Sequence, residues 1–139
     1  MLAIAGGTPV RQRPFPKWPI HDESDAQAVA DVIRSGFWGL GGQNVAEIEK
    51  RFAAFQDASY GVATSNGTSS LWLALTALGV GPGDEVIIPA YTFIATAAAV
   101  LQTGAVPVMA DIDPDTYCLD PDAAEAAITP RTACIIPVH

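Results

Sequence analysis

Residues 60–75 read YGVATSNGTSSLWLAL, in which a short strand-like run gives way to an apolar helix. At the junction, Gly67 lets the backbone approach a ligand, and Thr68 and the next two serines add hydroxyl donors. The first N–H groups of a helix have no partner within it, and they favour a small anion such as a phosphate. The same residue types also serve as ordinary N-caps of a buried helix, and the hexapeptide by itself leaves both interpretations open.

Beyond residue 60, strand-like runs rich in Val and Ile alternate with apolar helices. The predicted strands cover residues 62–64, 86–89, 106–110 and 133–138, and the predicted helices cover residues 71–78, 94–102 and 120–128. Pro107 indicates an edge position or the opening of its strand. Strands without polar alternation are buried on both faces, and connecting helices of this length imply crossovers. The expected fold class is α/β, with a mostly parallel sheet and flanking helices.

The first 60 residues carry a different pattern. Four prolines within residues 1–20 exclude a regular helix there, so we expect an extended N-terminal arm. Two amphipathic helices are predicted to follow, over residues 22–35 and 44–56. The first would have Ser24 or Asp25 as its N-cap and Gly36 beyond its end. The glycine-rich loop between the helices carries Phe37 and Trp38, and both a substrate contact and packing back onto a helix are open for these rings.

Charge and cysteine usage narrow the function classes. The chain of 139 residues has a formal net charge of -8 and no basic tract, which argues against nucleic-acid binding and favours small-molecule ligands. Cys118 and Cys134 belong to no zinc-like cluster, so we expect reduced thiols in a cytoplasmic protein and no structural metal. No secretion signal and no membrane-length apolar run is predicted.

Alternate acidic residues at Asp111, Asp113 and Asp115 are similar to part of a calcium loop. The glycine and the terminal glutamate of such a loop are absent at the required offsets, so this segment is predicted to be a turn after a strand. His139 directly follows a strand predicted to be buried, which is an unusual place for a domain to end. We therefore expect the chain to be the front part of a longer polypeptide.

Nine segments, taken in order, resemble the DegT/StrS family of sugar aminotransferases. They are GGTP (6–9), WP (18–19), SGFW (35–38), SNGT (65–68), GDEVIIP (83–89), YTF (91–93), GAVP (104–107), ITPRT (128–132) and PVH (137–139). Each segment alone is weak evidence, but their common order makes coincidence improbable. The resemblance extends over nearly the whole chain and over about the first third of a family member.

The resemblance implies a pyridoxal-phosphate enzyme of the fold-type-I aminotransferase class that works as a homodimer. It places the cofactor phosphate at Gly67, Thr68 and Ser69, and it stacks the ring of Phe93 on the pyridine. Ordinary core filling is the alternative role for Phe93. The resemblance also places Trp38 and Gly39 near the substrate entrance, although Leu40-Gly41-Gly42 departs from the Thr-rich loop of many relatives. Residues 21–139 would then be the first part of the large, cofactor-binding domain.

The implied reaction transfers an amino group from glutamate or glutamine to a keto sugar nucleotide or a cyclitol. The lysine that forms the Schiff base and the carboxylate that pairs with the pyridine nitrogen are expected beyond His139, so no catalytic residue is assigned here. Lys17 and Lys50 are the only lysines of the chain, and both are predicted to be surface charges. A lone histidine near a strand end is more often structural than catalytic, so His139 is given no role. The chain alone is predicted to be inactive.

Three other readings compete with this one. A sugar dehydratase on the same scaffold would have histidine in place of the downstream lysine, and a non-catalytic regulatory homologue would lack the lysine or the aspartate. A nucleotide-binding α/β domain is less well supported, because the chain has neither GxGxxG nor GxxxxGK[ST].

Overall fold

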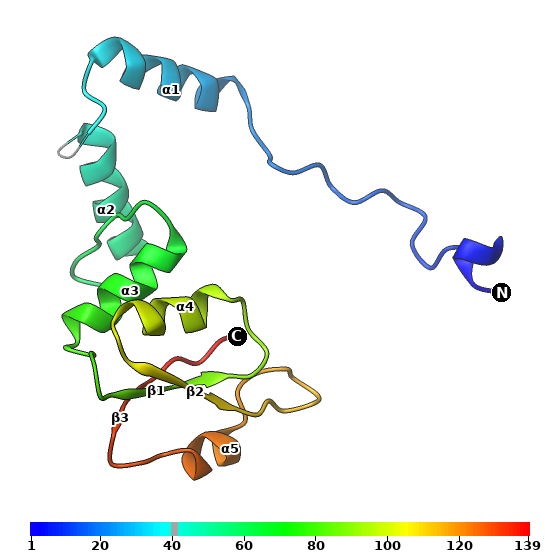
Figure 1. Ribbon diagram of the computed structural model, residues 1–139. Coiled ribbons are helices and arrows are strands. Elements are labelled where there is room, and N and C mark those ends of the chain that lie inside the picture. The colour runs from blue at the N-terminus through cyan, green and yellow to red at the C-terminus, as the bar shows by residue number, and fades with distance from the viewer. Residues whose placement is uncertain (40–41) are drawn as a thin grey trace. The chain divides into compact units, whose positions relative to one another are not determined.

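A computed structural model describes residues 1–39 and 42–139, and the chain divides into two units, Met1–Tyr60 and Gly61–His139. The second unit contains a three-stranded sheet in the order β2-β1-β3, with β1 spanning Glu85–Pro89, β2 Val106–Ala110 and β3 Thr132–Ile135 (Figure 1). Both neighbours run parallel to β1, and Ile87 is the partner of Val108 on one side and of Ile135 on the other. The prediction of an α/β fold with a parallel sheet is confirmed.

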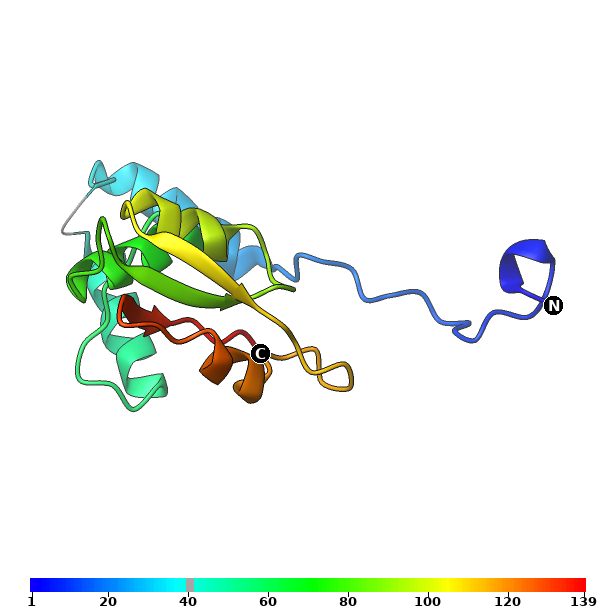
Figure 2. The ribbon, with the colours of Figure 1, turned by 60° about the horizontal axis from the view of Figure 1, so that its bottom comes forward.

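Helices cover both faces of this sheet. Helix α3 (Gly67–Ala77) and helix α4 (Ala95–Gln102) pack on one face, where Leu75, Val100 and Ile88 share a buried cluster. The short helix α5 (Pro121–Ala126) packs on the other face, where Ala124 meets Ile87. Figures 1 and 2 show α4 and α5 on opposite sides of the strands. The alternating side chains of β1 therefore enter two separate cores.

Only the central strand is buried along its whole length. All five residues of β1 are buried, whereas β2 is partly buried or exposed except at Ala110, and β3 alternates between partly buried and exposed positions. The prediction that every strand is buried on both faces is therefore wrong for β2 and β3, since each has a single neighbour within the described sheet. The edge position predicted from Pro107 is confirmed, because β2 lies outside β1. The last strand ends at Ile135, three residues before the predicted end.

The predicted strand over residues 62–64 is wrong. Residues 60–64 form neither a helix nor a strand, and Tyr60 and Val62 are mostly exposed. A strand needs a ladder of backbone hydrogen bonds with a neighbour, and the described sheet contains β1, β2 and β3 alone. Helix α3 begins at Gly67, four residues before the apolar stretch that predicted it.

The first unit contains two helices, α1 (Glu23–Ser35) and α2 (Gln43–Phe55). Asp22 is the N-cap of α1 and forms a capping box with Asp25, so the prediction of Ser24 or Asp25 as the cap is wrong. Gly36 ends this helix with a φ of 69°, as predicted. Residues 1–20 contain one turn of 3-10 helix, Ala3–Ala5, and no α-helix.

The acidic segment after β2 forms the predicted turn. The carboxylate of Asp113 accepts hydrogen bonds from the N–H groups of Thr116 at 2.7 Å and Asp115 at 3.0 Å, and these bonds lower its pKa. Among the described residues, no group of three or more His, Cys, Asp or Glu side chains could hold a metal ion. Cys118 and Cys134 are free thiols, as predicted.

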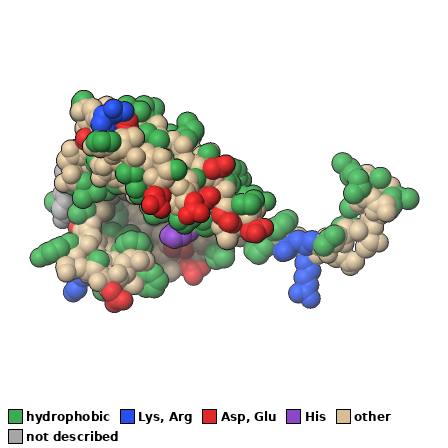
Figure 3. All heavy atoms as spheres, turned by 90° about the horizontal axis from the view of Figure 1, so that it is seen from below, with side chains coloured by type: hydrophobic (Ala, Val, Ile, Leu, Met, Phe, Trp, Pro, Cys, Tyr) green, Lys and Arg blue, Asp and Glu red, His purple; other side chains and the backbone are tan. Residues whose placement is uncertain are grey.

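In Figure 3, acidic side chains gather over part of the surface among hydrophobic ones, and Lys and Arg side chains are fewer there. This distribution agrees with the formal net charge of -8. Within the described part of the chain, every helix is too short or too polar to cross a membrane.

Candidate functional site

The start of α3 is capped by Asn66. Its side-chain oxygen accepts a hydrogen bond from the N–H of Ser69 at 2.9 Å, and its carbonyl accepts one from the N–H of Ser70 at 3.1 Å. Within the described part of the second unit, no acceptor is bonded to the N–H groups of Gly67 and Thr68. Two of the four donors at this helix end are therefore available to a ligand.

Gly67 faces open space. A Cβ atom added at this residue would meet no heavy atom within 4 Å, and the residue does not have a positive φ that would require glycine. Neither packing nor backbone conformation within the unit therefore explains the glycine. A ligand that approaches the backbone from this side does explain it.

A cavity of about 730 Å³ lies in front of these groups. This volume falls within the range of roughly 300–1,000 Å³ that is usual for small-molecule sites. Its lining comes from three places in the chain: the start of α3, the segment around the start of α4, and the residues that follow β3. The lining residues are Gly67, Thr68, Ser70, Leu71, Thr92, Phe93, Ala95, Thr96, Ile136, Pro137, Val138 and His139.

Phe93 is one of the residues that line this cavity. It lies between β1 and α4, its side chain belongs to neither core cluster, and the residue is 77% exposed. Within the described residues, Phe93 therefore does not fill a core. An exposed flat apolar face beside free N–H donors suits a ligand that has both an aromatic ring and an anionic group.

The structure thus brings together three of the four residues predicted to bind a cofactor: Gly67, Thr68 and Phe93. Ser69 does not line the cavity, and its N–H group is already bonded to Asn66. The binding roles of all four residues remain predictions.

Sequence reasoning missed a partly buried pair of hydroxyl groups in this cavity. The Oγ1 atoms of Thr92 and Thr96 are 2.9 Å apart, and Thr96 is only 4% exposed. The position of these residues in the sequence could have indicated the pair, because ligands of parallel α/β sheets bind beyond the carboxyl ends of the strands. Thr92 and Phe93 follow β1, and His139 follows β3, so all three belong to that edge.

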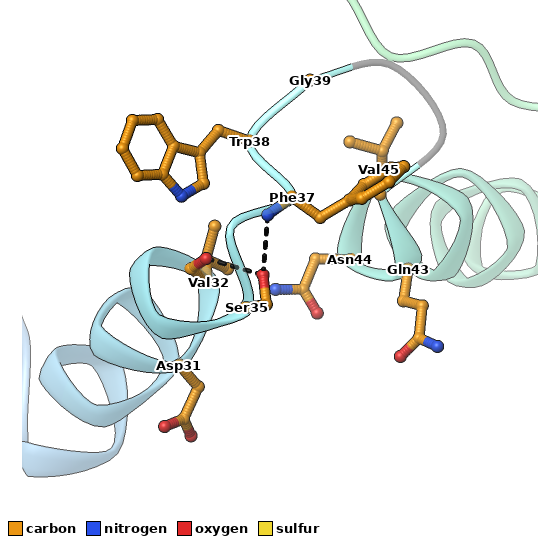
Figure 4. Close-up of a pocket in the computed structure, with 10 residues that line it drawn as sticks. Asp31, Val32, Ser35, Phe37, Trp38, Gly39, Gln43, Asn44 and Val45 are labelled. Carbon is orange, nitrogen blue, oxygen red and sulfur yellow. Dashed lines mark hydrogen bonds between the residues drawn. The ribbon is translucent and has the colours of Figure 1, made fainter.

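A second cavity, of about 540 Å³, lies within the first unit, between the end of α1 and the start of α2. The predicted substrate residues Trp38 and Gly39 both line it, and the side chains of Trp38 and Phe37 point in opposite directions from the loop (Figure 4). The indole N–H of Trp38 donates to the carbonyl of Ile33 at 3.2 Å, which ties the ring back to α1 while leaving it 74% exposed. Its substrate role stays a prediction.

The loop itself is fastened to α1 by Ser35. The hydroxyl of Ser35 donates to the carbonyl of Val32 at 2.7 Å and accepts from the N–H of Phe37 at 3.1 Å. The interpretation of residues 40–42 as a departure from the Thr-rich loop falls largely on Leu40 and Gly41, which lie outside the described residues.

The architecture and the larger cavity define an α/β protein with a candidate small-molecule site at the carboxyl edge of a parallel sheet. The chain belongs to the DegT/DnrJ/EryC1/StrS aminotransferase family, whose sequence model matches residues 19–139. The expectation drawn from the nine ordered segments is thereby confirmed.

Two relatives illustrate the match. The L-glutamine:2-deoxy-scyllo-inosose aminotransferase of Streptomyces kanamyceticus is 51% identical over 144 residues, which cover 99% of this chain and 34% of the relative. The 3-amino-5-hydroxybenzoate synthase of Amycolatopsis mediterranei is 47% identical over 126 residues, which cover 90% of this chain and 32% of the relative. The chain therefore spans about a third of the length of these relatives.

Solved structures agree with the sequence matches. The crystal structure of a 3-amino-5-hydroxybenzoic acid synthase is similar with a TM-score of 0.86 and 46% identity, over 91% of this chain and 33% of that one. A Bacillus subtilis protein solved with bound cofactor PMP has a TM-score of 0.80 and 44% identity, over 84% of this chain and 27% of that one. The predicted fold, part of a fold-type-I aminotransferase large domain, is confirmed by these matches.

Proposed function

We propose that the full-length protein is a pyridoxal-phosphate-dependent aminotransferase, and that residues 61–139 supply part of its cofactor site. The observation that carries the proposal is the meeting of two unbonded N–H groups, on Gly67 and Thr68, with the exposed ring of Phe93 at one cavity. Family membership supports it, and so does the relative solved with bound PMP.

The residues present fit this cofactor. A phosphate dianion needs several donors, which the N–H groups of Gly67 and Thr68 and the hydroxyl of Thr68 can provide. The space in front of Gly67 that a Cβ would fill is open for the phosphate oxygens. A pyridine ring needs a flat apolar neighbour, and Phe93 provides one.

In this proposal, the N–H donors and the aromatic ring of the cavity hold different parts of the cofactor. The N–H groups of Gly67 and Thr68 hold the phosphate and fix one end of the cofactor. The ring of Phe93 restricts the tilt of the pyridine and keeps water from one of its faces. The bound cofactor supplies an electron sink for amino transfer. The family resemblance also assigns Ser69 to the phosphate. Its N–H is already bonded to the capping side chain of Asn66, so Ser69 would act less directly.

The reactive lysine is not found among the cavity residues. Lys17 and Lys50 are both exposed and both belong to the first unit. The proposal therefore assigns the Schiff-base lysine, and the carboxylate for the pyridine nitrogen, to the part of the full-length protein beyond residue 139.

The names of two relatives support a proposal for the substrates. The relatives from Streptomyces kanamyceticus and Micromonospora echinospora are named for L-glutamine and 2-deoxy-scyllo-inosose. We propose glutamine as the amino donor and a keto cyclitol as the acceptor, with a keto sugar nucleotide as the second choice. Trp38 and Gly39 would contact this acceptor. The proposal also includes a cytoplasmic homodimer, an N-terminal arm over residues 1–20, and a large-domain portion over residues 21–139.

The test uses the full-length protein. It is titrated with pyridoxal phosphate, reduced with borohydride and digested, and the expected result is a visible chromophore and one modified lysine. The loaded protein is then incubated with glutamine and either 2-deoxy-scyllo-inosose or a keto sugar nucleotide, and mass spectrometry follows the amine. Amination of the cyclitol alone supports the assignment. A protein that neither retains the cofactor nor modifies a lysine contradicts it, and a retained cofactor with dehydration of a sugar would establish the rival activity.

A further inference from the structure

The ring of Phe93 needs an anchor that the hydrophobic core does not supply. Phe93 lies four residues after the end of β1 and two residues before the start of α4, and neither core cluster includes it. Its side chain is 77% exposed, so packing by its own unit does not fix the direction of the ring. The backbone on either side of Phe93 must therefore fix it.

Thr96 holds that backbone at two points. Its N–H donates to the carbonyl of Phe93 at 3.0 Å, and its hydroxyl is hydrogen-bonded to the hydroxyl of Thr92 at 2.9 Å. Thr92 directly precedes Phe93, so one residue of α4 is bonded both to Phe93 and to its neighbour. Because Thr96 is 4% exposed, water cannot easily replace the bond to Thr92 if this residue moves.

We infer that Thr96 is a positioning residue, which acts through Thr92 to set the ring of Phe93 against the pyridine of the cofactor. This inference rests on the proposed function. Thr96 is among the lining residues of the cavity but is only 4% exposed, and its hydroxyl is hydrogen-bonded to Thr92. Its contribution is therefore to the orientation of a neighbouring ring.

Two substitutions separate the hydroxyl from the shape of the side chain. Thr96→Val keeps the branched shape and the backbone N–H but removes the hydroxyl. Thr96→Ser keeps the hydroxyl. Thr76→Val is the matched control, because the Thr76 hydroxyl donates within α3 to the carbonyl of Trp72 at 2.8 Å and does not line the cavity.

Each variant of the full-length protein is titrated with pyridoxal phosphate, and the visible circular dichroism of the bound cofactor reports the orientation of its ring. Thr96→Val is expected to weaken binding about threefold to tenfold, the usual effect of one lost neutral hydrogen bond, and to reduce the visible ellipticity. Thr96→Ser and Thr76→Val are expected to match the wild type in both measurements.

A double-mutant cycle with Phe93→Ala decides whether Thr96 acts through the ring. If it does, Thr96→Val has no further effect once the ring is absent. An unchanged effect of Thr96→Val in the Phe93→Ala background overturns the inference, and so does wild-type binding and ellipticity in the Thr96→Val single variant. If Thr96→Val does not fold, loss of ellipticity in Thr96→Ser overturns the inference and its retention supports it. Failure of the wild-type protein to bind the cofactor would instead refute the proposed function.

Discussion

Glu85 and Arg131 form an ion pair that joins the beginning of β1 to the segment just before β3. The Nε of Arg131 donates to Oε1 of Glu85 at 3.0 Å, and a second guanidinium nitrogen contacts the same oxygen. The other carboxylate oxygen accepts a bond from the hydroxyl of Thr129 at 2.5 Å. Glu85 is buried, and these bonds hold the two strands in register where the ladder between them is irregular.

This pair predicts a pH dependence of stability. The bond from Thr129, followed by the bonds from Arg131, lowers the pKa of Glu85 from its ordinary value of 4.5. Because the pKa is lowered in the folded state, the stabilisation is present above pH 4.5 and is lost as the pH falls through the lower folded pKa. In the full-length protein, Glu85→Gln should lower the melting temperature at pH 7, and its difference from wild type should shrink in acid. Glu125→Gln, at an exposed position on α5, is the control. A difference that does not change with pH would contradict this account.

Gly67 offers a test that separates ligand binding from folding. A Cβ at this position meets no protein atom within 4 Å, so Gly67→Ala should fold, with a gain of about 0.4–1 kcal/mol from the less flexible unfolded chain. The new methyl group would occupy the space proposed for the phosphate, and the affinity for pyridoxal phosphate should fall about tenfold or more, which corresponds to the loss of one charge-assisted hydrogen bond.

The control for Gly67 is Gly104→Ala. Gly104 has a φ of 84°, and its Cβ would lie 2.9 Å from Cγ of Pro82, so this variant should lose stability. Both variants are measured by thermal melting and by cofactor titration. Gly67→Ala should gain stability and lose cofactor affinity, whereas Gly104→Ala should lose stability. Unchanged cofactor affinity in Gly67→Ala would count against the proposed phosphate site.

Neighbouring hydroxyls at the start of α3 should differ in importance. Thr68 lines the cavity and Ser69 does not, although the family resemblance assigns both to the phosphate. We therefore expect Thr68→Val to weaken the binding of pyridoxal phosphate about tenfold, since a hydrogen bond to a charged group is lost, and Ser69→Ala to have little effect. Equilibrium titration by fluorescence measures both. An equal loss in the two variants would mean that the Ser69 hydroxyl also reaches the phosphate.

The strand predictions show where sequence patterns sufficed. Val86, Ile87 and Ile88 form an unbroken apolar run, and such a run belongs to a central strand with cores on both sides, which is how β1 is placed. Residues 62–64 were also predicted to be a strand but do not form one, because a strand also depends on a partner that local sequence does not specify.

Part of the candidate site could be predicted from the sequence. Gly67 was predicted from its position at a helix start, whereas Phe93 was placed beside it only by the family resemblance. The structure brings both residues to one cavity at the carboxyl edge of the sheet. The role of Thr96 could not be anticipated. It stands in the apolar stretch Phe93–Val100, whose pattern indicates core packing, and only the three-dimensional arrangement shows its hydroxyl bonded to Thr92. For Ser69, the motif did not show that the backbone N–H is already bonded to the side chain of Asn66, and the binding role of this residue stays a prediction.

Asn66 determines which N–H donors at the start of α3 remain free, because its side chain caps the helix. Asn66→Ala removes the acceptor for the N–H of Ser69 and should cost about 1 kcal/mol of stability. Asn66→Ser keeps a capping oxygen and should stay close to wild type. Asn66→Asp keeps the cap as well but adds a negative charge beside the phosphate, so it should weaken pyridoxal phosphate while leaving unphosphorylated pyridoxal unaffected. Titration of the three full-length variants with both compounds measures this selectivity. Equal weakening of both compounds by Asn66→Asp would show that the phosphate does not lie at this helix end.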